Sequence, residues 1–258
     1  MKIRGAFFAL VAVTGSTIIP ISGAITNSTP SSAAVAACGT FKNSYFDGLQ
    51  ADPANDSDIG SSASMNNQFA YFCTSVQTTN NQTSAWTMIQ GSNNSICQYT
   101  QTGIITNATR IYYEDEFFAE YDNGNCQTGF VVVYGVTLSN FGEVHHYWDQ
   151  FVPSCNCEYE NVDVTTFQTT PFNPKNWTEP VRSTWSGEDT YLGSDMPGNP
   201  GEGYTSFTGL QVQQWNGAYT NTLPALGSLN DNVLRYTHTN VSGNAFTLGT
   251  WYEYGAPP

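Results

Sequence analysis

Short runs of aromatic and β-branched residues alternate along this chain with clusters of Asn, Gly, Asp and Ser. Such runs are typical of β-strands, and the small polar clusters are typical of turns. Helix signals are scarce, and hairpin-type turns occur at Asp122-Asn123-Gly124 and Asn216-Gly217. The pattern predicts an all-β antiparallel sandwich or barrel with almost no helix. The expected strands are Phe69–Val76, Ala85–Gln90, Cys97–Thr106, Ile111–Tyr121, Gly129–Leu138, Val144–Val152, Glu158–Thr166, Ser183–Tyr191, Thr205–Trp215 and Ala245–Tyr254.

The N-terminal segment has the pattern of an export signal. Lys2 and Arg4 precede an apolar run from Ala6 to Val13, and small residues up to Ala24 offer a cleavage site. The next residues are rich in Ser, Thr and Ala, and no later linker or internal repeat divides the chain. We therefore expect a secreted, extracellular protein with a signal peptide at 1–24, a flexible lead-in at 25–37 and one β-sandwich domain at 38–258.

Charge is sparse and acidic. The chain has 21 Asp and Glu against 7 Lys and Arg, for a net charge of -14 at pH 7. A negative field of this size repels nucleic acid and anionic membranes, so we expect neither as a partner. Protonation of the carboxylates in acid would leave few charges, which is compatible with an acid-tolerant exported protein.

Six cysteines indicate an oxidising compartment. The sequence favours a bridge between Cys97 and Cys126, which flank neighbouring strand candidates, and the Cys155-Asn156-Cys157 spacing is tight for a relaxed bridge. A metal site at Cys155, Cys157 and the His145-His146 pair is the alternative. Neighbouring residues of a strand face opposite sides, so the two histidines do not suit one metal ion. We expect no metal and no cofactor.

Two motifs carry the candidate chemistry. Gln101 lies in Tyr99-Thr100-Gln101-Thr102-Gly103, and Glu188 lies in Trp185-Ser186-Gly187-Glu188-Asp189. In a strand, Tyr99, Gln101 and Gly103 share one face, and the glycine leaves room for a ligand backbone. A carboxamide N–H can stabilise a developing oxyanion, and a carboxylate can act as a general base. Taken alone, the Gln101 triplet favours a structural glutamine that is hydrogen-bonded inside a sandwich, and the alternative for Glu188 is an ordinary polar strand residue that faces solvent.

Together these motifs resemble the glutamic peptidases, the eqolisin and neprosin-like families. The eqolisin series of an Ala-Trp strand, a Gln-Thr-Gly strand and an aromatic strand with an internal Glu is similar to the segments around Trp86, Gln101 and Glu120. The Gly-Gly-Glu and Met-Gly segments of neprosin-like sequences are similar to the segment around Glu188 and to Asp195-Met196-Pro197-Gly198. The resemblance spans Ser84 to Gly198.

The resemblance implies a concanavalin-like or jelly-roll β-sandwich and an acid endopeptidase that acts on extracellular polypeptide. Gln101 and Glu188 would form the catalytic dyad that activates water. The residues expected to contact substrate, or to support the dyad in the case of the glutamate, are Trp86, Tyr99, Gly103 and Glu120.

The chain also departs from the eqolisin pattern. Gln90 and Ile105 stand where eqolisins carry acidic residues near the Gln-bearing strand. The abundance of aromatic residues leaves a second hypothesis open, a non-catalytic module that binds wall polysaccharide or another glycan through exposed rings.

Overall fold

The computed structural model describes residues 41–51, 58–66, 68, 70, 72–73, 81–91, 98–107, 116–123, 130–137, 142–163, 165–170, 174, 181–191, 194–200, 203–223, 226–231 and 235–250. The chain separates into two compact units, Met1–Ser32 and Ala33–Pro258, and every described residue belongs to the second. The described part of this unit consists of β-strands, turns and short loop segments and contains no α-helix.

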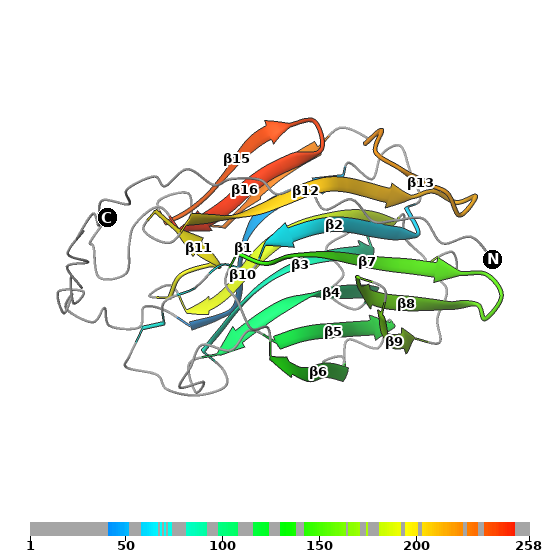
Figure 1. The fold of residues 1–258 in the computed structure, drawn as a ribbon, viewed down its shortest axis with the longest axis horizontal. Helices are drawn as coiled ribbons and strands as arrows, with labels where there is room; N and C mark the ends of the chain where they lie inside the picture. The colour runs from blue at the N-terminus through cyan, green and yellow to red at the C-terminus, as the bar shows by residue number, and fades with distance from the viewer. Residues whose placement is uncertain are drawn as a thin grey trace, which may run out of the picture. The chain divides into compact units, whose positions relative to one another are not determined.

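Among the described residues, the first sheet has seven antiparallel strands, with β3 at its centre between β10 and β4 (Figure 1). In spatial order its strands are β14 (Leu226–Asn230), β1 (Phe41–Ala51), β10 (Val181–Tyr191), β3 (Gln82–Gly91), β4 (Gln98–Asn107), β5 (Glu116–Asn123) and β6 (Phe130–Thr137).

The second sheet is also antiparallel. Its strand order is β15 (Tyr236–Ser242), β16 (Ala245–Thr250), β12 (Gly203–Gln213), β2 (Gly60–Asn66), β7 (Val144–Val152), β8 (Cys157–Val162) and β9 (Thr165–Thr170). Two short strands, β11 (Gly198–Asn199) and β13 (Tyr219–Thr220), pair with β12. The two sheets form an antiparallel β-sandwich of the concanavalin-like or jelly-roll type, which confirms the expected fold class.

The core lies between the two sheets and is filled by alternate residues of their strands. Trp185 and Ile104 contribute from the first sheet, and Phe207 and Phe246 stack on each other in the second with ring centroids 4.5 Å apart. The Trp185 indole N–H donates to the Ser62 carbonyl oxygen over 2.9 Å and so joins β10 to β2. Burying these rings supplies much of the stability of the sandwich.

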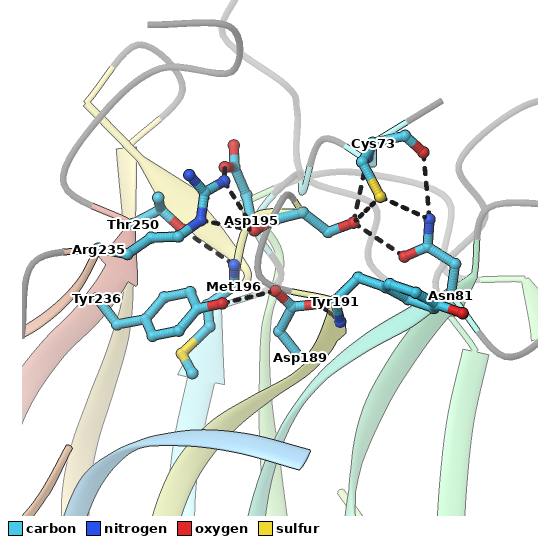
Figure 2. Close-up of polar contacts among 10 residues, drawn as sticks. Cys73, Asn81, Asp189, Tyr191, Asp195, Met196, Arg235, Tyr236 and Thr250 are labelled. Carbon is cyan, nitrogen blue, oxygen red and sulfur yellow. Dashed lines mark hydrogen bonds and ion pairs between the residues drawn. The ribbon is translucent and has the colours of Figure 1, made fainter. Parts of the chain in front are cut away.

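The segment predicted as a strand at Phe69–Val76 is not a strand where the structure describes it, at Ala70, Phe72 and Cys73. The Cys73 backbone bonds to two side chains. The Cys73 N–H donates to Ser194 Oγ over 3.1 Å, and the Cys73 carbonyl accepts from Asn81 Nδ2 over 3.2 Å (Figure 2). Side-chain partners therefore take the place of a strand ladder here.

The single strand predicted at Glu158–Thr166 is divided into β8 and β9. Asp163 has a φ of 53°, the left-handed conformation that reverses the chain and that Asp tolerates better than most residues. The sequence prediction also missed β1, β2, β14 and β15. The hairpin turn expected at Asn216-Gly217 joins β12 to β13, with Gly217 at a φ of 89°.

Cys155 and Cys157 form a disulfide, although their spacing made a relaxed bridge look unfavourable. Asn156 has a φ of 55°, and this turn brings the two Cα atoms to 5.2 Å, an ordinary separation for a bridge. Cys73 is disulfide-bonded as well. The bridge expected between Cys97 and Cys126 lies outside the described residues.

His145 and His146 face opposite sides of β7, as expected. The His145 ring contacts Phe117 of the first sheet, with centroids 5.1 Å apart, whereas the His146 ring stacks on Trp148. No group of three or more His, Cys, Asp and Glu side chains is arranged to hold a metal ion in the described part of the chain. Among the same residues, no helix is long and apolar enough to span a membrane.

Candidate active site

The strand register places Gln101 and Glu188 on one face of the first sheet. Glu188 of β10 pairs with Ser84 of β3, and Met88 of β3 pairs with Gln101 of β4. Directly paired residues share a face, and so do residues two or four apart on one strand. Because the alternate residue Ala85 lies in the core between the sheets, Gln101 and Glu188 lie on the outer face, which points away from the second sheet.

Trp86 lies between these two residues on β3. Its indole N–H donates to Glu188 Oε2 over 3.2 Å. The ring is only 1% exposed and packs edge-on against Phe46, with centroids 6.1 Å apart, and against Met88 and Phe118. A ring held on several sides keeps the N–H in one place, so Trp86 orients the Glu188 carboxylate. Contact between Trp86 and a substrate stays a prediction.

The structure shows a further requirement for a glycine at position 103, set by the neighbouring strand β3. It pairs with Trp86, and a Cβ at this position would lie 2.7 Å from the Cα and the Cβ of Trp86. Real Cβ atoms do not approach other heavy atoms so closely. The glycine therefore makes room for β3 and the tryptophan, and not only for an approaching ligand backbone.

Glu120 holds the Gln101 carboxamide. Gln101 Nε2 donates to Glu120 Oε2 over 2.8 Å, and the Tyr99 hydroxyl donates to Glu120 Oε1, also over 2.8 Å. A carboxamide has two N–H donors, so one remains for another acceptor after the bond to Glu120. The bond to Glu120 therefore fixes the orientation of the Gln101 carboxamide, and a role of Glu120 in supporting the dyad stays a prediction.

The electrostatics of this group follow from burial. Burial raises the pKa of Glu120, hydrogen bonds from Tyr99 and Gln101 lower it, and Asp122 raises it; the net direction is upward. The pKa of Tyr99 is also raised, first by burial and then by the charges of Glu120, Asp122 and Glu188. Both Glu120 and Glu188 therefore act on the Tyr99 hydroxyl, which lies in the field of the two carboxylates.

The structure thus arranges the predicted residues in two hydrogen-bonded groups on one face. Glu188 and Trp86 form the first, and Gln101, Glu120 and Tyr99 form the second. Glu188 is partly exposed, so water can reach its carboxylate. A carboxylate, an oriented carboxamide and water are the components of base-assisted attack on a carbonyl group.

The residue after Glu188 points the other way. Asp189 is fully buried in the sandwich and accepts from the Tyr236 hydroxyl over 2.8 Å (Figure 2). Burial raises the pKa of Asp189 to about 7, against the lowering effect of its hydrogen bonds and of Arg235. Asp189 is a structural acid of the core, whereas Glu188 remains available on the outer face.

The Asp195-Met196 segment of the second motif is also structural. Asp195 pairs with Arg235 over 3.2 Å, and the Met196 N–H donates to Thr250 Oγ1 over 3.0 Å (Figure 2). The Met196 side chain is buried in the core. This segment anchors the chain that follows β10 and does not reach the outer face of the sheet.

Sequence reasoning missed the apolar side chains that surround Trp86, namely Phe46, Met88 and Phe118. No local motif marks them, because they come from three different strands. The two departures from the eqolisin pattern have ordinary partners: Gln90 Nε2 donates to Thr184 Oγ1 over 3.1 Å, and Ile105 packs against the same apolar cluster.

Comparison with known proteins supports the fold. Neither a family model nor a curated protein matches this sequence. Among solved structures, the chain is similar to scytalido-glutamic peptidase bound to a peptide-based transition-state analogue, with 12% identity, a TM-score of 0.55, and coverage of 83% of this chain and 100% of the other.

A second similar structure is SCP-B, a peptidase of the eqolisin family in complex with the tripeptide Ala-Ile-His. It has 13% identity, a TM-score of 0.54, and coverage of 83% of this chain and 100% of that chain. At such identity the likeness shows the fold alone. This chain has a glutamic-peptidase-like β-sandwich.

Proposed function

We propose that this protein is an exported acid endopeptidase that uses Gln101 and Glu188 to hydrolyse extracellular polypeptides. One observation carries the proposal: both side chains lie on the outer face of the first sheet, and each is oriented by a neighbour, Glu188 by Trp86 and Gln101 by Glu120. The glutamic-peptidase-like fold supports the same assignment.

In the proposed mechanism, the attacking water molecule binds at the Glu188 carboxylate, on the same face of the sheet as Gln101. Glu188 takes a proton from the water as its oxygen attacks the scissile carbonyl carbon. The remaining N–H of the Gln101 carboxamide donates to the oxyanion that forms. The tetrahedral intermediate then collapses, the C–N bond breaks, and Glu188 returns the proton to the leaving nitrogen. The products are a carboxylic acid and an amine, and Glu188 is again ionised.

Export is part of the proposal. The basic and apolar pattern of residues 1–24 supports it. The Cys155–Cys157 bridge and the disulfide at Cys73 also support it, because disulfides persist in oxidising compartments. The excess of acidic residues fits a protein that works in acid, where most of its charge is neutralised.

The buried aromatic rings favour the enzyme over the glycan-binding hypothesis at this face. Stacking on sugar requires an accessible ring, whereas Trp86 and Phe118 are 1% and 2% exposed. In the described part of the chain, the exposed tryptophan is Trp215, in the turn between β12 and β13. Trp86 and Phe118 are therefore not available as stacking rings at this face.

The test is cleavage of a denatured protein substrate by the purified mature protein between about pH 2 and pH 7, the range in which carboxyl groups titrate. We expect maximal cleavage in acid and no inhibition by serine, cysteine or metal-directed inhibitors, because the dyad contains none of those groups. Cleavage that a chelator or a thiol reagent abolishes, or no cleavage anywhere in the range, would contradict the proposal.

A further inference from the structure

A serine, a histidine and an aspartate meet where the edge strands of the two sheets come together. Ser228 of β14 lies with its Oγ 3.1 Å from Nε2 of His238 on β15. The other ring nitrogen, Nδ1, lies 2.5 Å from Oδ1 of Asp47 on β1. The imidazole therefore bridges a hydroxyl and a carboxylate through its two different nitrogens, which is the arrangement that activates a serine nucleophile.

The fold builds this group from residues that are far apart in sequence. Asp47 pairs with Asn230 and Leu49 pairs with Ser228, which fixes β14 against β1. Asn230 Nδ2 donates to the Tyr236 carbonyl oxygen over 3.2 Å and links β14 to the start of β15. Among the described strands, β14 and β15 are the edges of their sheets.

The solvent exposure of the three side chains increases from Asp47 to Ser228. The Asp47 side chain is fully buried, the His238 side chain is 14% exposed, and Ser228 is exposed. The Phe246 ring meets the His238 ring edge-on at 6.4 Å between centroids and limits its rotation. A buried acid, a held imidazole and an accessible hydroxyl are what a serine nucleophile needs in order to meet a substrate from solvent.

Asp47 also selects the tautomer of the His238 imidazole. A carboxylate at Nδ1 favours the proton on that nitrogen and leaves Nε2 able to accept the Ser228 proton. Burial raises the pKa of Asp47, while bonds from His238, Gly48 and Asn230 lower it, with a net upward direction. Asp47 is therefore more often protonated in acid than an exposed aspartate. The other titratable side chains described on β1, β10, β14, β15 and β16 are Tyr45, Arg182, Glu188, Asp189, Tyr191 and Tyr236, and Asp231 and Arg235 lie directly beside the ends of β14 and β15.

We propose that Ser228, His238 and Asp47 form a second hydrolytic site that acts on short-chain carboxylic esters near neutral pH. Leu226 lies two residues before Ser228 on the same face of β14 and is only partly buried, so it offers apolar contact to a short acyl chain. Among the described strands, β14 has a neighbour on one side only. Backbone N–H groups on the open side of an edge strand can bind an oxyanion.

The reaction proceeds in two steps. Ser228 Oγ attacks the ester carbonyl carbon and its proton moves to His238 Nε2; the C–O bond to the alcohol then breaks, and the alcohol leaves with that proton. Water next attacks the acyl-serine and gives a proton to His238. Oγ leaves the acyl carbon and takes the proton back, which releases the carboxylic acid. No oxidant or cofactor is needed.

This site is separate from the Gln101 and Glu188 face. Asp47 lies on the inner side of β1, while its chain neighbour Phe46 pairs with Glu188 and packs against Trp86 on the outer side. The two sites should also differ in pH dependence. The imidazole must be unprotonated and Asp47 ionised for ester hydrolysis, so this activity should increase from acid to neutral pH.

The test uses p-nitrophenyl acetate hydrolysis together with labelling by a fluorophosphonate, followed by peptide mapping. We expect the label on Ser228, hydrolysis that increases from about pH 5 to pH 8, and a loss of about a hundredfold or more in Ser228→Ala and His238→Gln. Asp47→Asn should lower the labelling rate at neutral pH by about tenfold or more, because the tautomer is no longer fixed. Ser242→Ala removes an exposed hydroxyl of the β15–β16 hairpin and should change neither readout.

Three results would overturn the proposal: no label on Ser228 in the folded protein, hydrolysis that persists in Ser228→Ala, or labelling that is equally fast in His238→Gln. Circular dichroism and thermal melting of each variant show that the fold is intact. Labelling of wild-type Ser228 needs no variant, so the proposal can fail even where a substitution prevents folding. Peptide cleavage in acid should persist after complete labelling, which separates this site from the peptidase.

Discussion

At the scale of single residues, Trp86 connects the parts of the candidate active site. Its indole N–H binds Glu188, and its backbone lies so close to Gly103 that the glycine cannot carry a side chain without a shift. Gln101 lies two residues from Gly103 on the same face of β4. A change at Gly103 should therefore disturb both the strand pairing and the two proposed catalytic groups.

We predict that Gly103→Ala destabilises the protein by about 1–3 kcal/mol, because overpacking against a backbone cannot be relieved by a rotamer change. The measurement is urea unfolding followed by tryptophan fluorescence. Gly243→Ala is the matched control, since a Cβ there meets no heavy atom within 4 Å. Equal unfolding free energies for the two variants would show that the Trp86 contact does not require a glycine.

At the scale of strands, the local alternation of residues predicted the positions of many strands. Features that depend on backbone conformation at one residue or on long-range pairing were not predicted. The alternation of β7 gave its bounds, Val144–Val152, and placed His145 and His146 on opposite faces. The break between β8 and β9 was not predictable, because it rests on a single Asp163 in the left-handed conformation and not on a Gly or Pro.

The candidate site divides in the same way. Alternation along β4 correctly put Tyr99 and Gln101 on one face, but the bond between Trp86 and Glu188 joins residues 102 positions apart. That contact depends on the register between β3 and β10, which no local pattern fixes. The group at Ser228, His238 and Asp47 was not found from sequence for the same physical reason.

At the scale of the whole domain, the sandwich buries several acids. Asp149 and Glu158 are fully buried on the inner face of the second sheet, and among the described residues neither Glu158 oxygen has a hydrogen-bond partner. Burial raises the pKa of both well above the ordinary value, and the charge of Glu160 on β8 raises both further. Together with Asp189, whose pKa is about 7, these groups favour the protonated state in the folded chain.

The sign of the pH dependence follows from proton binding. Between the ordinary carboxyl pKa values and about pH 7, the folded chain holds protons that the unfolded chain has lost, so stability falls as pH rises through this range. We predict a melting temperature that is higher at pH 4 than at pH 7. Differential scanning calorimetry at constant ionic strength measures it, and a melting temperature that increases toward pH 7 would refute the assignment of these acids.

Two substitutions test this prediction, one at a buried acid and one at an exposed acid that serves as the control. Glu158→Gln removes the charge but keeps the shape, so it should stabilise the protein at pH 7 and have little effect at pH 4, where wild-type Glu158 is already neutral. Glu143→Gln changes an exposed acid and should have little effect at either pH.

The most direct test of the central claim is the rate of peptide cleavage in acid by Glu188→Gln. If Glu188 is the general base, its loss should lower kcat on the order of 10²–10⁴ or more while the protein remains folded. Gln101→Ala should lower kcat by roughly 10²–10³, as for an oxyanion donor, and Glu120→Gln should have a smaller effect. Unchanged cleavage by a folded Glu188→Gln variant would contradict the peptidase assignment.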